Sequence, residues 1–172
     1  VFSSFTQMPK PPSAPSKAPH KLWERVMSPQ TLIDCAFPGT FAHVSDHLKK
    51  LQVELERNAV EPEPKDDILI VLAELLNNIV EHGYCASGKG NIHLTVHAHK
   101  RPDKNAVYIR TIDQGPPVPA DVLIGAPLPS LTEDIQDMPE GGFGWFMIHT
   151  LAESINYERV DEENRFTFCV GF

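Results

Sequence analysis

Three side chains with catalytic or ligand-binding chemistry recur every fourth residue: Glu74, Asn78 and His82. If the segment 66–84, DDILIVLAELLNNIVEHGY, is a helix, this spacing stacks them along one ridge. An amide oxygen suits a hard cation such as Mg²⁺, and a carboxylate one turn away can take a proton from an attacking hydroxyl or water. The ridge therefore predicts a place where a ligand or water meets polar groups, with a solvated helix face as the simpler alternative.

The segment 66–84 also has the pattern of an amphipathic helix. Its apolar residues recur at helical spacing and predict one buried stripe: Ile68, Leu72, Leu75 and Ile79, widened by Val71 and Leu76. We expect the helix to begin at Asp66, because Asp66 and Asp67 can cap it, and to end at Gly83. The buried stripe would hold the polar ridge in a fixed position.

Two glycine-containing segments further along the chain could join this ridge. Asp113 ends a strand predicted at 107–112, and its carboxylate can accept a hydrogen bond from an exocyclic amine while Gly115 lets a flat ring come close. The segment 141–144, GGFG, opens a predicted helix, where exposed amides and the helix dipole favour an anion. Each pattern alone also occurs in ordinary turns.

The order of the predicted elements indicates the fold class. Apolar alternation predicts strands at 30–37, 92–98, 107–112, 154–160 and 165–172, and a surface helix spans 41–55. The order β, α, α, β, β, loop, α, β, β predicts an α+β two-layer sandwich: a mixed, mostly antiparallel sheet with helices on one face. The long loop 114–140 is interpreted as a lid or binding segment, with a disordered insert as the alternative.

Composition limits the compartment and the partners. The formal charge of −8 argues against a nucleic-acid partner, and no stretch resembles a membrane span or a signal peptide, so we expect a cytoplasmic protein. Residues 1–21 predict a Pro-rich arm or linker and residues 22–172 a single domain. The chain opens on Val, which suggests that it was cut from a longer protein. Three dispersed cysteines indicate reduced thiols.

Three histidines alternate along the strand 92–98 and its end: His93, His97 and His99. On one face of a strand they could bind a metal ion. A solvated strand face is the more usual reason for such a pattern, and we expect these side chains to face away from the helices.

The three polar segments together resemble a known superfamily. ELLNNIVEHGY resembles the N box of the GHKL ATPases, which include gyrase, the ninety-kilodalton chaperone, histidine kinases and mismatch-repair ATPases. DQG resembles their G1 motif and GGFGWFMI their G2 motif. Within the superfamily, the chain is most similar to the anti-sigma-factor serine kinases of the RsbW and SpoIIAB type, over roughly residues 30–172. The resemblance implies the Bergerat ATP-binding fold, with ATP and Mg²⁺ as cofactors.

The resemblance also implies roles for the helix ridge. Glu74 would be the catalytic base and Asn78 the Mg²⁺ ligand. His82 matches the N-box histidine, whose role is open between packing or hydrogen bonding and a direct phosphate contact.

Further roles follow for the two glycine segments and the last strand. Asp113 would bind the adenine amine, Gly115 would shape that pocket, and Gly142 and Gly144 would lie at the phosphates. Thr167 matches a hydroxyl residue that shares a water with the Asp113 position and adenine.

The sequence departs from the G1 pattern at one position. Where the family commonly has the second glycine of DxGxG, this chain has Pro117, within a run of prolines at 116–119. Proline fixes φ and removes an amide, so we expect a stiffer lid hinge, which bears on turnover more than on binding. Trp145 replaces a smaller aliphatic residue and could pack under the lid.

Three functions are consistent with these features. The first is an ATP- and Mg²⁺-dependent serine/threonine kinase acting on a STAS-type anti-anti-sigma partner. The second is a nucleotide-gated binding module without efficient phosphoryl transfer. The third is the catalytic domain of a larger histidine kinase. Residues 1–30 are too short and proline-rich to supply the phosphoacceptor helices, so these would have to lie further upstream. The resemblance further implies a homodimer and a sigma factor as a second partner.

Overall fold

The computed structural model describes residues 29–85, 88–99, 104–123 and 143–172. Its elements follow the predicted order: β1 (Gln30–Pro38), α1 (Phe41–Arg57), α2 (Pro62–Asn78), the π-helical turn η2 (Ile79–Gly83), β2 (Asn91–His99), β3 (Ala106–Asp113), α3 (Ala120–Leu123), α4 (Phe143–Leu151), β4 (Glu153–Val160) and β5 (Glu163–Gly171). The predicted N-terminal arm, most of the predicted lid and Gly142 lie outside the described residues.

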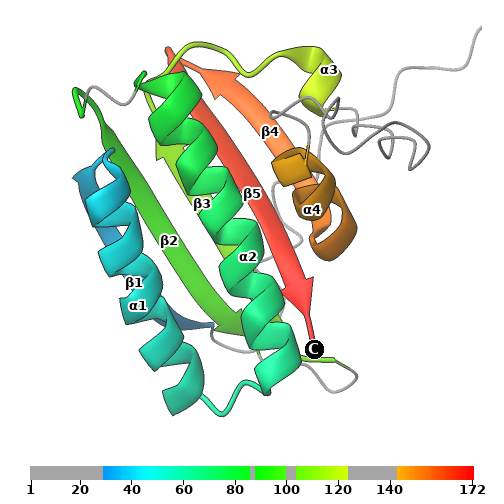
Figure 1. The fold of residues 1–172 in the computed structure, drawn as a ribbon. Helices are drawn as coiled ribbons and strands as arrows, with labels where there is room; N and C mark the ends of the chain where they lie inside the picture. Colours follow the sequence, from blue (N-terminus) through cyan, green and yellow to red (C-terminus); the bar gives the residue numbers. More distant parts are fainter. Residues whose placement is uncertain (1–28, 86–87, 100–103, 124–142) are drawn as a thin grey trace, which may run out of the picture.

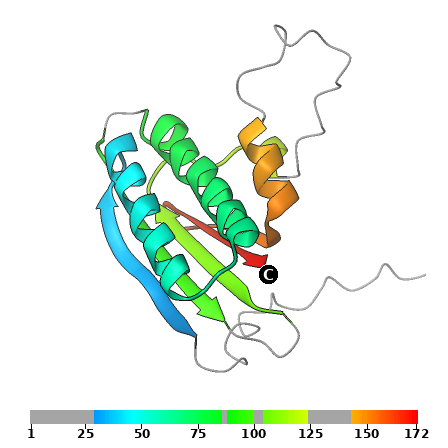
Figure 2. The same ribbon diagram turned by 60° about the horizontal axis from the view of Figure 1, so that its bottom comes forward.

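The strands form one five-stranded sheet in the order β1-β2-β3-β5-β4. Every neighbouring pair is antiparallel, so the described sheet contains no parallel pairing. Helices α1, α2 and α4 all lie on the same face of this sheet (Figures 1 and 2). The predicted α+β two-layer fold with helices on one face is therefore confirmed, whereas the prediction of a mixed sheet is wrong, because every described strand pair is antiparallel.

Alternation along the strands explains how the two layers pack. In β2, Ile92, Leu94 and Val96 are completely buried while His93 is exposed, so one face of the strand meets the helices. The helices contribute fully buried leucines to the same core, among them Leu51, Leu55, Leu72 and Leu76. This packed core holds the ends of α2, β3 and β5 in fixed positions relative to one another.

Helix α2 begins one turn earlier than predicted. Its first residue is Pro62, whose fixed φ and missing amide suit the first helical position. The prediction that the helix begins at Asp66 is wrong, and Asp66 and Asp67 lie inside the helix instead of capping it.

The end of α2 also differs from a simple helix terminus. Residues Ile79–Gly83 form a π-helical turn, and the Tyr84 amide donates to the carbonyl of Ile79 at 3.0 Å. Gly83 does not adopt a positive φ; among the described glycines only Gly88 does. The glycine at position 83 is therefore not needed for a left-handed cap.

The β4–β5 hairpin is tighter than the sequence predicted. Its turn consists of Asp161 and Glu162, with φ values of 49° and 67°, as in a two-residue type I′ turn. The predicted four-residue turn 161–164 is therefore wrong. Because β5 begins at Glu163, Asn164 is part of the strand and pairs with Asp113 of β3 and Arg159 of β4.

The carboxyl ends of α2, β3 and β4 and the start of β5 meet at one end of the molecule (Figure 1). None of the helices in the described ranges is both long and apolar enough to cross a bilayer.

Candidate functional site

A cavity of about 510 Å³ lies at the end of the molecule where these elements meet. Its lining comes from four regions: Leu75, Asn78, Ile79, His82 and Gly83 of α2 and η2; Asp113 of β3 with Pro116–Pro119 and Val122 after it; Trp145 of α4; and Asn164 and Phe166 of β5. The wall is mainly apolar, with a few polar side chains at defined places. Such a cavity is typical of a site for a small molecule with a flat, partly apolar group.

Asp113 is the buried acid of this cavity, with 5% of its surface exposed. Its Oδ1 accepts hydrogen bonds from the Gly115 amide and from Nδ2 of Asn164, both at 2.8 Å. Among the described residues, no hydrogen bond reaches Oδ2. One carboxylate oxygen is therefore held by the protein, and the other is available to a donor on a ligand.

Two opposing effects act on the pKa of the Asp113 carboxyl. Burial raises the pKa of the carboxyl, while the hydrogen bonds from Asn164 and Gly115 and the positive charge of Arg159 lower it. The net effect is a pKa above the ordinary value. The two donors and the positive charge of Arg159 thus favour an ionised group that burial alone would disfavour.

Position 115 requires glycine, because the neighbouring backbone leaves no space for a Cβ atom. A Cβ on Gly115 would lie 2.8 Å from Cα of Gly83 and 2.9 Å from Oδ1 of Asp113. No side chain can occupy that space, because one of the obstacles is backbone. The end of η2 and the start of the loop after β3 therefore touch through two glycines.

Tyr84 fixes the same junction from the side. Its hydroxyl donates to the carbonyl of Asn91 at 2.7 Å and accepts from the amide of Gln114 at 3.0 Å. Burial raises the pKa of this hydroxyl, and the nearby Asp113 carboxylate adds to the increase, so the group stays neutral and can do both. The ring packs where side chains on Gly39 or Gly90 would collide with it.

The start of α4 lies against the ridge of α2. A Cβ on Gly144 would collide with Oε2 of Glu74 and lie 3.8 Å from Nδ2 of Asn78. The structure therefore brings Glu74, Asn78 and Gly144 together. Glu74 is not among the lining residues of the cavity; it lies one helical turn beyond Asn78.

Asn78 has an unsatisfied amide at this place. Its Nδ2 is buried and has no hydrogen-bond partner in the described part of the chain. Buried amides are rarely left without partners, so a ligand is the natural one. Rotating the amide by 180° exchanges Nδ2 and Oδ1, so Asn78 can present either a donor to an anion or an oxygen to a cation. The residue thus fits the predicted Mg²⁺ or phosphate contact.

Asn164 is a site residue that the sequence interpretation missed. It is buried, and its amide links Asp113 to the loop after β3 and to Arg159 and Tyr157 of β4. The length of the turn before β5 is the signal that would have identified Asn164. A two-residue turn at 161–162 starts the strand at 163 and places Asn164 opposite Asp113.

Thr167 is not brought to the cavity. Its neighbours Phe166 and Phe168 are buried on the helix-facing side of β5, and successive side chains of a strand point to opposite faces. The predicted placement of Thr167 beside Asp113 is therefore wrong, because a shift of one residue along a strand reverses its face. Asn164 is the polar side chain of β5 that reaches Asp113 instead.

The departures from the family pattern form one wall of the cavity. Pro116, Pro117 and Pro119 all line it, and the amide of Val118 between them donates to the hydroxyl of Tyr157 at 3.1 Å. Trp145 is buried and packs on Phe166 with ring centroids 5.5 Å apart. These residues supply the flat apolar surfaces between which a ring can lie.

The strand histidines do not form a metal site. In the described ranges there is no cluster of three His, Cys, Asp or Glu side chains that could hold a metal ion. His93 pairs with Asp34 at 2.8 Å, His97 with Thr31 at 3.1 Å, and His99 is buried beside Tyr108. The polar-face interpretation therefore holds for His93, whereas His99 is covered.

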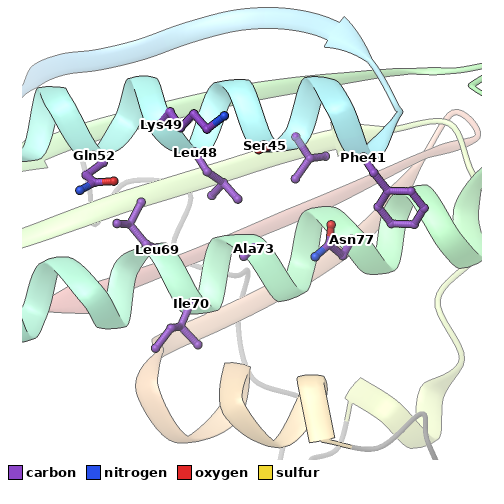
Figure 3. A pocket seen from close by; sticks show the side chains of 10 residues that line it. Phe41, Ser45, Leu48, Lys49, Gln52, Leu69, Ile70, Ala73 and Asn77 are labelled. Carbon is purple, nitrogen blue, oxygen red and sulfur yellow. The ribbon is translucent and has the colours of Figure 1, made fainter.

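A second hollow, of about 390 Å³, lies between α1 and α2 on the outer side of the helix layer (Figure 3). It is lined by Phe41, Val44, Ser45, Leu48, Lys49, Gln52, Leu69, Ile70, Ala73 and Asn77. This groove contains no carboxylate, imidazole or thiol. The cavity around Asp113 is thus the better candidate for chemistry.

Comparisons with known proteins identify related sequences and a similar fold. The profile of the histidine kinase-like ATPase domain matches residues 37–170. The serine-protein kinase RsbW of Halalkalibacterium halodurans is 32% identical over 91 residues, which are 52% of this chain and 52% of that protein. The chain therefore spans about half the length of this relative. The SiaB-SiaC complex from Pseudomonas aeruginosa contains a similar fold, with a TM-score of 0.52 and 15% identity over 83% of this chain and 91% of that chain.

Proposed function

Because this chain belongs to the family of histidine kinase-like ATPase domains, we propose that it is an ATP- and Mg²⁺-dependent protein kinase. Its substrate is a serine or threonine of a small STAS-type anti-anti-sigma protein. The observation that carries the proposal is the layout of the site. An acceptor for an amino group, Oδ2 of Asp113, lies in an apolar cavity that Asn78 also lines, and the Glu74–Asn78 ridge packs on the start of α4.

The base of the nucleotide binds at the Asp113 end. Oδ2 accepts a hydrogen bond from the exocyclic amine of adenine, and the ring lies between the proline wall and Trp145. Gly115 shapes this end indirectly: with no side chain it lets the loop after β3 pack on the backbone of Gly83, which holds the loop beside Asp113.

The phosphates bind at the ridge end. Asn78 presents its amide there, and His82 lines the same cavity. Gly144, and Gly142 outside the described residues, let the backbone at the start of α4 approach the phosphates. Bound Mg²⁺ would neutralise charge on the phosphate oxygens, with Asn78 as its protein ligand.

Glu74 accepts the proton of the attacking hydroxyl. It lies one turn from Asn78 and against Gly144, so a hydroxyl directed at the last phosphate would meet its carboxylate. Positioning the two reactants contributes the rest of the acceleration. The similarity to a protein named serine-protein kinase supports a serine or threonine acceptor, and the likeness to the SiaB-SiaC complex supports a protein partner. A homodimer and a sigma factor as second partner are expectations of the same family resemblance.

Phosphoryl transfer tests this proposal through Glu74→Ala. We expect the variant to bind ATP with Mg²⁺ as the wild type does, but to transfer labelled phosphate to a STAS-type partner about a hundredfold more slowly. Glu63→Ala, an exposed glutamate on the same helix, is the matched control and should transfer at the wild-type rate. Unchanged transfer by Glu74→Ala would refute the assignment of the base.

A nucleotide-gated binding module is the second candidate, and the proline wall favours it. Three prolines around Val118 make the segment after Gly115 stiff, and closure of a site during turnover requires such a segment to move. A partner that binds in a nucleotide-dependent way and stays unphosphorylated by the wild type would select this function over the kinase.

A further inference from the structure

We infer that Asn164 is the positioning residue that makes this site select a base with an exocyclic amino group. It holds Asp113 and the first residues of the following loop in the geometry in which only Oδ2 of Asp113 faces the ligand. The inference rests on the proposed nucleotide site and adds a determinant of its base specificity.

The donor end of the Asn164 amide is directed at Asp113 and the loop. Nδ2 lies 2.8 Å from Oδ1 of Asp113, 3.0 Å from the carbonyl of Pro116 and 3.4 Å from the carbonyl of Gly115. An amide nitrogen carries only two protons, so the two shortest contacts are the principal bonds. One side chain thus ties the recognising acid to the backbone that follows it.

The acceptor end of the same amide fixes its orientation. Oδ1 of Asn164 accepts from Nη1 of Arg159 at 2.7 Å and from the hydroxyl of Tyr157 at 2.8 Å. Both partners donate, so the reverse orientation of the amide would place donors against donors. Arg159 and Tyr157 therefore determine that the NH₂ group points to Asp113.

The two β4 residues also hold the loop directly. Arg159 donates to the carbonyl of Gly115 at 2.6 Å, and Tyr157 accepts from the amide of Val118 at 3.1 Å. The tip of the β4–β5 hairpin therefore contacts the loop at Gly115, Pro116 and Val118. This cluster is part of the protein's own structure and would exist before a nucleotide binds.

Base selection follows from the state of Asp113. Its Oδ1 already accepts two hydrogen bonds, and Oδ2 is solely an acceptor while the carboxyl is ionised, whereas protonation would add a donor there. A 6-amino group, as in adenine, donates to Oδ2. A 6-oxo group, as in hypoxanthine, presents an acceptor to an acceptor and leaves the buried oxygen unpaired. Without the Asn164 donor, the carboxyl would turn or take up a proton, and the preference would be lost.

Calorimetric titration of ATP and of inosine triphosphate, each with Mg²⁺, tests the inference on the full chain. For the wild type we expect ATP to bind at least about tenfold more tightly than inosine triphosphate. Asn164→Ala and Asn164→Asp should each weaken ATP by about tenfold or more while changing inosine triphosphate little, so that the preference disappears. Asn156→Ala, an exposed asparagine on the same hairpin, is the matched control and should retain the preference.

The pH dependence separates positioning from simple loss of structure. In Asn164→Asp two carboxyls adjoin and share one proton at moderately acid pH, and that proton restores a donor to Asp113. ATP binding by this variant should therefore recover as the pH falls, whereas binding by Asn164→Ala should not. His82, Tyr84 and Arg159 also face this region, but they are common to all variants, so the difference between profiles reports position 164.

Several outcomes would overturn the inference. One is an unchanged ATP preference in either variant; another is an equal loss of both nucleotides. The inference would also be contradicted if Asn164→Asp is folded, as judged by its thermal melt, but does not regain ATP binding as the pH falls. If the wild type binds ATP but any of these results is found, the inference fails and the proposed function stands. A folded wild type that binds neither nucleotide overturns both the inference and the proposed function.

Discussion

At Asp113, two hydrogen-bond donors and one nearby positive charge, from three parts of the chain, favour a negative charge in a buried place. The Gly115 amide, the Asn164 amide and the Arg159 guanidinium offset the burial that raises the pKa of the carboxyl. The offset is incomplete, since the pKa stays above its ordinary value. The acid therefore lowers stability at neutral pH, as expected of a group that serves the ligand recognition proposed above.

The substitution Asp113→Asn tests whether the buried charge lowers the stability of the folded protein. The folded-state pKa lies above the unfolded one, so the folded protein binds the proton more tightly, and wild-type stability falls as pH rises between the two values. The amide that replaces the carboxyl cannot ionise, and its oxygen remains an acceptor for Gly115 and Asn164. We expect thermal melts of Asp113→Asn to equal or exceed the wild type, with the larger advantage above the folded-state pKa. A variant less stable than the wild type at neutral pH but not at acid pH would contradict this.

Sequence reasoning identified the residues of the site that carry local signals. Asp113 and Gly115 follow a strand, and Asn78 lies on a helix ridge, so their neighbours in the sequence indicate their surroundings. Asn164 has no such signal, because its importance comes from pairing with a strand that lies much earlier in the chain. Thr167 is expected at the site only through its match to a family residue, and a shift of one residue in such a match reverses the strand face.

At the scale of elements, the junction of η2 with the loop after β3 depends on two glycines. Gly115 has backbone of Gly83 within 2.8 Å of its Cβ position, whereas the nearest atom to a Cβ on Gly83 is 3.6 Å away, an ordinary contact. Although the two glycines touch, position 83 can accommodate a Cβ atom and position 115 cannot.

The pair Gly115→Ala and Gly83→Ala measures this difference. We expect Gly115→Ala to lose about 2 kcal/mol or more of unfolding free energy, as overpacked sites do, and to lose nucleotide binding as the loop shifts. Gly83→Ala should cost less than about 1 kcal/mol, because its φ is not positive and its Cβ has room. Chemical denaturation of both variants gives the comparison, and equal losses would show that the contact does not constrain the junction.

The hairpin turn contains the other backbone constraint. Glu162 has a φ of 67°, in the left-handed region that costs a residue with a side chain about 1 kcal/mol. Glu162→Gly should therefore raise the unfolding free energy by about 0.5–1 kcal/mol, which thermal denaturation resolves. Glu162→Ala keeps the strain and serves as the control. No difference between the Gly and Ala variants would mean that the turn is not strained at this residue.

Element boundaries were less predictable than element types. The sequence predicted each long helix and strand, because apolar periodicity extends over many residues. It did not predict that α2 begins at Pro62, since two Asp residues suggested a cap further on, or that the last turn is π-helical. A single inserted residue in a helix is compatible with the same apolar pattern, and only packing of the next element decides it.

For the whole molecule, the two-layer fold determines where chemistry can take place. The long helices and the antiparallel sheet form a closed core (Figure 1). The cavity is lined by side chains from α2, β3, β5 and α4. The fold class was predictable from element order and from the three family motifs. The composition of the cavity walls was not, because Trp145, Phe166 and Pro116–Pro119 meet only in the folded chain.

The central claim is that this cavity binds ATP with Mg²⁺ through Asp113, and one titration tests it most directly. Calorimetric titration of ATP, with and without Mg²⁺, into wild type and Asp113→Asn should show Mg²⁺-dependent binding by the wild type. The variant should bind at least about tenfold more weakly while its thermal melt shows an intact fold, because its amide presents a donor to the adenine amine. Binding of equal strength by both proteins, or none by a folded wild type, would contradict the account.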